Sequence, residues 1–133
     1  MKVLYALLCE QGQERQDGRL DVHGIFHQLY APAFPAQQER MTLAVAIEWE
    51  PHERGKIDFS IELVDPSGSP VLSITGNTDV SERPLQGPPQ TRMVMPLDGI
   101  IFPAEGTHVF ELAVGGERQR LAPLHLLCDS AAN

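Results

Sequence analysis

The sequence is poor in lysine, in aromatic residues and in long apolar runs, and each shortage excludes a class of protein. Aromatic residues make up 6% of the chain. The chain has ten basic and 18 acidic residues, which gives a formal net charge of −8. The only lysines are Lys2 and Lys56, and the arginines are scattered. A phosphate backbone needs a basic stripe, so we expect no nucleic-acid partner. No apolar run approaches the ~20 residues that a membrane-spanning helix needs, so we expect no membrane partner.

Cysteine is also scarce. Cys9 and Cys128 are the two cysteines, and both sit beside leucine. This setting favours free, buried thiols, because an unpaired cysteine behaves as a small apolar side chain. A disulfide between the first and the last strand stays open as the alternative. No Cys-x-x-Cys pair is present to suggest a structural zinc site.

The sequence has no convincing secretion signal. Met1–Glu10 resembles a short one, because a lysine precedes a run of apolar residues. The run is at the lower limit of the ~7–15 residues typical of such signals, and Glu10 closes it without a small-residue cleavage site. Leu8 stands where a lipoprotein signal would carry a small residue before Cys9. We interpret the segment as a strand that is apolar on both faces, and we expect a cytoplasmic protein.

Motifs that carry catalysis are absent as well. The sequence contains no Gly-x-Ser-x-Gly, no glycine-rich phosphate loop and no dinucleotide-binding fingerprint. Glu48 and Glu50 alternate with Trp49, as an outward polar row would, and no pair of carboxylates is placed for acid–base chemistry. We therefore predict that the protein is not an enzyme and binds no cofactor.

What the sequence does have is a period of two, which is clearest near its C-terminus. Between Thr107 and Leu127, apolar residues such as Phe110 and Leu112 alternate with their neighbours on both sides of Gly115-Gly116. Alternation places one apolar face on each strand. Adjacent glycines favour a type I′ turn, in which both central residues take positive φ. This stretch therefore predicts a β-hairpin.

The same reasoning predicts six earlier strands and no helix. These strands are expected at residues 2–9, 20–30, 41–50, 57–63, 71–80 and 91–97. Short strands at such spacing indicate an all-β protein, an antiparallel Greek-key β-sandwich (immunoglobulin-like or C2-like) of about eight strands. We expect a single domain at residues 1–129 and a frayed tail at residues 130–133.

The connections between these strands suggest a candidate recognition end. Residues 31–40 and 81–90 are predicted to cross between the sheets, and residues 98–106 to form a bend. If successive strands alternate in direction, one end of the molecule collects Phe34, Pro35, Asp65, Asp98, Phe102 and Pro103. Sandwich proteins commonly bind through loops at one end. The alternative is that the two aromatic residues of this set fill the gap between the sheets.

Histidines provide a weaker alternative site. His23 and His27 share one face of the predicted strand at residues 20–30 but stand roughly 13 Å apart, too far to hold one ion together. A metal site would need one of them with His108 or His125. The alternative function is therefore a small-ligand or metal-binding protein that uses these histidines with aspartates at the loop ends.

Several short motifs together resemble a known family. They are Leu7-Leu8-Cys9-Glu10, Asp17-Gly18, Gly24-Ile25-Phe26, Ala31-Pro32, Phe34-Pro35-Ala36, Leu63-Val64-Asp65-Pro66-Ser67-Gly68 and Phe102-Pro103. This combination resembles a family of short bacterial proteins of unknown function. The resemblance implies a free-standing cytoplasmic bacterial domain, and it carries no activity and no catalytic residue.

These observations favour a non-catalytic protein-interaction or accessory module. The first strand is apolar on both faces, so both faces need cover. The cover can come from strands of its own chain or from a second copy. We therefore expect a homodimer that forms through this sheet or a neighbouring edge.

Overall fold

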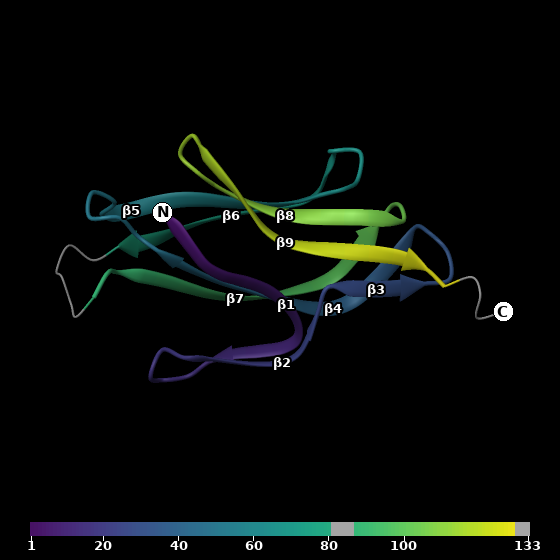
Figure 1. The fold of residues 1–133 in the computed structure, drawn as a ribbon, viewed down its shortest axis with the longest axis horizontal. Helices are drawn as coiled ribbons and strands as arrows, with labels where there is room; N and C mark the ends of the chain where they lie inside the picture. Colours follow the sequence, from purple (N-terminus) through teal and green to yellow (C-terminus); the bar gives the residue numbers. More distant parts are fainter. Residues whose placement is uncertain (81–86, 130–133) are drawn as a thin grey trace.

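The computed structural model describes residues 1–80 and 87–129, which form nine strands in two sheets (Figure 1). The strands are β1 (Lys2–Glu14), β2 (Leu20–Phe26), β3 (Gln28–Ala31), β4 (Ala36–Glu48), β5 (Gly55–Val64), β6 (Pro70–Val80), β7 (Gln90–Phe102), β8 (Gly106–Val114) and β9 (Glu117–Cys128). The first sheet has the order β2-β1-β4-β7, and the second has the order β3-β9-β8-β5-β6. The all-β prediction is confirmed.

Nothing in the described ranges could serve as a transmembrane helix, since no helix there has the necessary length and apolar character. The predicted tail at residues 130–133 and most of the predicted connection at residues 81–90 lie outside the described residues.

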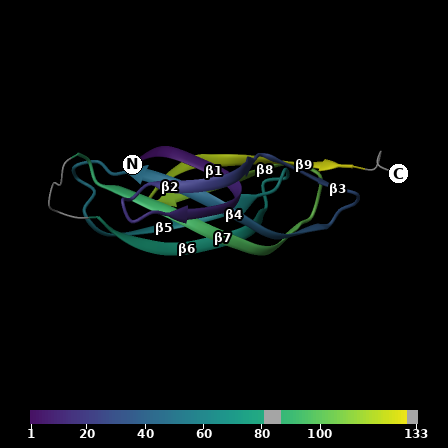
Figure 2. The same cartoon turned by 90° about the horizontal axis from the view of Figure 1, so that it is seen from below.

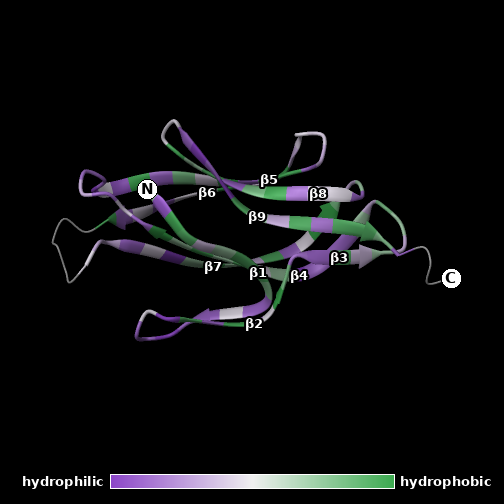
Figure 3. Cartoon of the chain, viewed as in Figure 1, coloured by the Kyte–Doolittle hydropathy of each residue, from purple (hydrophilic) through white to green (hydrophobic). Residues whose placement is uncertain are grey.

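One hydrophobic core lies between the two sheets. It is built from alternate residues of the central strands, such as Leu43, Val45 and Ile47 of β4 and Phe110 and Leu112 of β8. These are the inward positions that the alternation of the sequence predicted. In Figure 3 the first half of β1 is mostly apolar, whereas its second half is polar. The core therefore fixes the register of both sheets, because a slip by one residue would turn each apolar row towards solvent.

The β8–β9 hairpin is confirmed, with a different turn. Val114 pairs with Glu117 across Gly115 and Gly116, so the turn has two central residues. Gly115 has a φ of 59°, whereas Gly116 is not among the positive-φ glycines. Positive φ at the first central residue alone is the type II′ pattern, so the type I′ prediction is wrong.

The predicted strand at residues 20–30 is two strands in different sheets. β2 pairs antiparallel with β1, and β3 pairs in parallel with β9, from Gln28 opposite His125 to Ala31 opposite Cys128. His27 lies in the break, and its backbone oxygen accepts a hydrogen bond of 2.9 Å from the nitrogen of His125. The prediction of purely antiparallel sheets is therefore wrong at this edge, because the chain changes sheets within one residue.

The predicted bend at residues 98–106 is shorter than expected, because only residues 103–105 lie between β7 and β8. β7 runs without a break to Phe102 because β4 begins at Ala36, earlier than expected, and supplies partners along its whole length. Their register is continuous from Ala36 opposite Phe102 to Glu48 opposite Gln90. Asp98 consequently lies within a strand rather than at its end.

The second half of β1 separates from β4 and passes, together with β2, over the outer face of β4. Beyond Cys9, β1 pairs only with β2. A Cβ atom built on Gly12 would lie 3.4 Å from the side chain of Val94 on β7, although β4 separates β1 from β7 in the sheet. The β1–β2 hairpin therefore crosses the outside of β4, and in Figure 1 it hangs below the rest of the sheet.

This crossing explains why β4 is buried on both faces. Thr42, Ala44 and Ala46 point away from the main core, yet their exposed fractions are 5%, 0% and 1%. Small side chains at alternate positions let the hairpin approach closely. The sequence prediction identified the inner row of β4 and missed this outer row.

Candidate functional site

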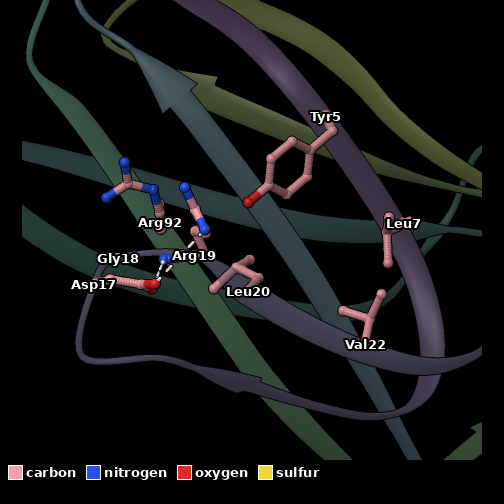
Figure 4. Close-up of a pocket in the computed structure, with 8 residues that line it drawn as sticks. All are labelled: Tyr5, Leu7, Asp17, Gly18, Arg19, Leu20, Val22 and Arg92. Atoms are coloured by element: carbon pink, nitrogen blue, oxygen red, sulfur yellow. Dashed lines mark hydrogen bonds and ion pairs between the residues drawn. The ribbon is translucent and has the colours of Figure 1, made fainter.

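A groove opens beneath the β1–β2 hairpin on the outer face of the first sheet (Figure 4). Its volume is about 510 Å³, within the range of small-molecule sites. Its lining residues come from β1, β2, the turn between them and β7: Tyr5, Leu7, Asp17, Gly18, Arg19, Leu20, Val22 and Arg92. Three segments that are distant in the sequence thus build one site.

The two ends of the groove differ in polarity. Leu7 and Val22 form an apolar end and the guanidinium groups of Arg19 and Arg92 lie at the other end, with Leu20 between them (Figure 4). All three apolar side chains are partly buried. An arrangement of this kind can hold a molecule with an apolar body and a negative charge at one end.

Asp17 is occupied by its own turn. Its Oδ1 accepts a hydrogen bond of 3.0 Å from the backbone nitrogen of Arg19, and its Oδ2 lies 3.1 Å from Nη2 of Arg15 and 3.9 Å from Nη1 of Arg19. Because these partners offset its negative charge, Asp17 does little to neutralise the rest of the groove.

Arg92 is not neutralised in the same way. Its Nη2 donates a hydrogen bond of 3.1 Å to Oε1 of Gln90, and no carboxylate of the described chain forms an ion pair with it. Its guanidinium lies against Gly18, where a built Cβ atom would be 3.1 Å from Nη1. The glycine, with a φ of 85° and no side chain, lets the turn lie close against the guanidinium.

Tyr5 adds a hydrogen-bond donor. Its hydroxyl points towards the charged end in Figure 4. Partial burial raises the pKa of Tyr5 above its ordinary value, because burial disfavours the charged phenolate, and the nearby Arg92 acts in the opposite direction. The phenol therefore keeps its proton at neutral pH.

A second groove runs between the edge strands β6 and β7, which lie next to each other along one margin of the molecule (Figure 2). Its volume is about 390 Å³. It is lined by Leu72, Ile74, Val94, Met95, Pro96, Leu97, Asp98 and Ile100. On this margin, side chains of the interior reach the surface because the two sheets are not joined there by a ladder.

Most of the predicted recognition end lies together, but its aromatic residues point inwards. Phe102 is 1% exposed and its ring meets the ring of His108 edge-on at a centroid distance of 5.3 Å. Phe34 is partly buried and packs against the core, while Pro35 and Pro103 are exposed.

Asp65 and Asp98, also predicted for that end, are separated and differently engaged. Oδ1 of Asp65 accepts hydrogen bonds of 2.9 Å from the backbone nitrogens of Ser67 and Ser69, and one of 2.7 Å from the hydroxyl of Ser67. The Ser67 hydroxyl and these amides lower the pKa of Asp65 below its ordinary value. Asp98 is exposed on β7 and lies 3.7 Å from Nε of Arg40.

The four histidines of the alternative site do not gather in one place, although the backbones of His27 and His125 are hydrogen-bonded to each other. His23 lies on β2 opposite Gln11, His27 lies in the break before β3, and Nδ1 of His125 is 2.9 Å from the hydroxyl of Thr107. Across residues 1–80 and 87–129, no three metal-binding side chains are grouped so that they could hold an ion. Both cysteines are free: Cys9 is buried beneath the hairpin, and Cys128 is exposed.

His108 is the exceptional histidine because it is fully buried with one nitrogen unsatisfied. Its Nδ1 lies 3.3 Å from the backbone oxygen of Gly106, so this nitrogen carries the proton and donates. Nε2 has no hydrogen-bond partner in the described structure. Burial lowers the pKa of His108 below its ordinary value, while the hydrogen bond to Gly106 and the charge of Asp65 act in the opposite direction.

We expect His108 to weaken the fold in mild acid. The unfolded chain binds a proton near the ordinary pKa of 6.5, whereas the folded chain binds it only at lower pH. Stability is therefore present above pH 6.5 and is lost as the pH falls towards the folded pKa, by at most about 1.4 kcal/mol per pH unit. His108→Phe should flatten this dependence, as measured by urea unfolding at pH 7.5 and pH 5.0. An equal loss of unfolding free energy between pH 7.5 and pH 5.0 in the wild type and in His108→Phe would contradict the expectation.

Comparison with known proteins gives a family and little else. A model of a family of unknown function (DUF6941) matches residues 4–132. The comparison with curated proteins found no match. Among solved structures, the chain is similar to the Pseudomonas fluorescens alkylpurine DNA glycosylase AlkC bound to DNA containing an abasic site analog, with 17% identity and a TM-score of 0.43. That match covers 77% of this chain and 28% of the glycosylase chain.

Proposed function

The chain belongs to the family of unknown function DUF6941, and we propose that it is a non-catalytic interaction module that pairs with a second copy of itself through β6. The supporting observation is the edge position of β6 in the second sheet. One side of β6 pairs with β5, and none of the strands in residues 1–80 and 87–129 continues the ladder on its far side. Unpaired backbone groups along an edge are a template for another strand.

The side chains of β6 suit this role. Ser73, Thr75 and Asn77 are exposed and uncharged, whereas the whole chain carries a formal charge of −8. Pro70 stands at the start of the strand, and no proline or lysine follows within it. Between Leu72 and Thr78 the strand therefore lacks the prolines and charged side chains that commonly protect an edge from pairing.

A second copy is the partner that this edge fits best. Two identical antiparallel strands can pair about a two-fold axis, so the backbone N–H and C=O groups of one copy bond to those of the other. Pairing centred on Thr75 would place Ser73 opposite Asn77 and Val71 opposite Asp79. The carboxylate of Asp79 would then not face its own copy, and the pairing would avoid a like-charge contact.

The neighbouring edge is less suitable. β7 carries Pro96 in its middle, and proline supplies no backbone donor. It nevertheless adds to the surface beside β6, since the groove between the two edges exposes Leu72 and Ile74. Covering these side chains on association would contribute hydrophobic stabilisation.

The proposal extends to the finer class of fold and to the setting of the protein. We infer a Greek-key β-sandwich of the immunoglobulin-like or C2-like kind, supported by two sheets that share one core and by connections that pass from one sheet to the other. We further infer a bacterial, cytoplasmic protein without enzymatic activity. No nucleophile with an adjacent base lines either groove described above.

Replacing Thr75 by lysine tests the β6 interface. The side chain is exposed, so the fold should change in stability by less than about 0.5 kcal/mol. In the dimer the two lysines would face each other across the axis, and like charges directly opposite are destabilising. We expect the dissociation constant of the dimer to rise at least tenfold, as measured by sedimentation velocity over a range of concentrations.

Gln28→Lys provides a matched control, because it makes the same change of charge at an exposed position of β3, the opposite edge of the same sheet. This variant should associate like the wild type. A wild-type chain that remains monomeric at millimolar concentration would refute self-association. A dimer that Thr75→Lys leaves unchanged would exclude β6 as its interface.

A further inference from the structure

We propose that the groove beneath the β1–β2 hairpin binds a small amphipathic anion, with a carboxylate or phosphate head at Arg92 and an aliphatic body along Leu20 and Val22. The proposal concerns a different surface from the β6 edge. It starts from the unlike ends of the groove, which lie apart in Figure 4.

The groove has a positively charged end, whereas the chain as a whole is negatively charged. The protein has a formal net charge of −8, yet Arg19 and Arg92 both line this groove. Asp17, the acidic residue in the lining, is engaged by Arg15 and Arg19. The uncompensated positive charge is therefore that of Arg92, and an anion is the ligand that complements it.

The head of the ligand would find hydrogen-bond donors at the charged end of the groove. A guanidinium offers a planar pair of N–H groups that matches the oxygens of a carboxylate or a phosphate. The Tyr5 hydroxyl, directed to the same end, can donate a further hydrogen bond. Gly18 lies close against the guanidinium, where a Cβ atom would stand 3.1 Å from Nη1 of Arg92, and so helps to fix the position of the charged group.

The body of the ligand would lie on an apolar surface. Leu7 and Val22 remain partly exposed at the end of the groove away from Arg92, and the partly exposed Leu20 continues this surface towards the charged end. Covering these side chains would remove apolar area from water at roughly 25 cal/mol per Å². A volume of about 510 Å³ has room for an aliphatic chain but is small for a folded partner.

Titration with decanoate and with decyl phosphate tests the proposal, using the full chain labelled with ¹⁵N and probe concentrations below micelle formation. We expect saturable binding of one probe molecule per chain, with the largest amide shifts at Tyr5, Gly18, Val22 and Arg92. Decanol, which lacks the charge, should bind at least tenfold more weakly. The tighter of the two anions identifies the head group as carboxylate or phosphate.

Arg92→Gln should weaken the binding of both anions at least tenfold and leave that of decanol unchanged. Arg92 is exposed, so this variant is expected to fold, and its thermal unfolding provides the check. Arg120→Gln removes an equal charge from β9 of the other sheet and should bind like the wild type. The Thr75→Lys variant should also bind normally, which separates this site from self-association.

Two results would overturn the proposal. One is the absence of saturation with both anions up to the highest concentration free of micelles. The other is equal affinity of Arg92→Gln and the wild type, which would place the bound anions elsewhere on the protein.

Discussion

Replacing Phe110 by alanine is expected to lower the free energy of unfolding by about 3–5 kcal/mol. Phe110 has an exposed fraction of 0% and belongs to β8, which lies between β9 and β5 in the second sheet. It stands opposite Leu63, which is equally buried. Truncation would leave a cavity that the paired strands on both sides cannot close, so the cost includes lost packing as well as lost transfer free energy.

A loss of this size is a large part of the ~5–15 kcal/mol that keeps a typical domain folded. Urea unfolding followed by the fluorescence of Trp49 would measure it, because Trp49 is 2% exposed and its Nε1 donates a hydrogen bond of 2.8 Å to Thr91. Ile101→Ala is the control, since Ile101 is 58% exposed and its loss should cost about 0.5 kcal/mol or less. Similar values for the two variants would mean that Phe110 does not anchor the core.

The inward rows of the core could be predicted from the sequence because they depend on a local pattern. In β5 the alternation of Ile57, Phe59, Ile61 and Leu63 with polar residues is unbroken, and all four contribute to the core. Such a strand has one apolar face, and that face is buried by packing against the other sheet. The hairpin of β8 and β9 was predictable for the same reason, together with its glycine turn.

The errors arose where position depends on a distant partner. Nothing local indicates that the chain changes sheets at His27, because the break exists only through the parallel pairing of β3 with β9. Nor does Asp98 carry a sign that β7 continues past it, since its partner in the ladder is Arg40 of β4. The prediction therefore placed His23 and His27 on one strand and Asp98 at a loop. In the structure His23 lies on β2, His27 lies in the break before β3, and Asp98 lies within β7.

The groove beneath the hairpin was missed for a related reason. Tyr5, Arg19 and Arg92 are far apart in the sequence, and the crossing of β1 over β4 brings them to one place. The one available signal was the row Thr42, Ala44 and Ala46, whose small size is unusual for the outer face of a strand covered only by water. A row of small residues that alternates with large ones indicates a strand covered on both faces.

Replacing Gly106 by alanine is expected to be the most damaging glycine substitution near the predicted recognition end. Gly106 has a φ of 127°, a conformation that costs a residue with a side chain of the order of 1–3 kcal/mol. A Cβ atom there would also lie 2.7 Å from Cγ of Pro66, closer than real atoms approach. The proline ring cannot rotate away, so the clash adds to the backbone strain.

The effect should reach the buried histidine as well. The backbone oxygen of Gly106 accepts the hydrogen bond of His108, whose other ring nitrogen already lacks a partner. A shift of this strand end would leave a second polar atom unsatisfied in the interior, at a further cost of about 1–3 kcal/mol. The total loss of unfolding free energy should therefore exceed what backbone strain alone produces.

Gly68→Ala separates these contributions. Gly68 also has a positive φ, of 90°, but a Cβ atom there would meet nothing within 4 Å. The control should therefore lose only the cost of the backbone conformation, and Gly106→Ala should lose at least 1–2 kcal/mol more, by the clash and the broken hydrogen bond. Equal losses in urea unfolding would show that Pro66 yields, and that the contact between the β5–β6 turn and the start of β8 does not hold this end of the molecule rigid.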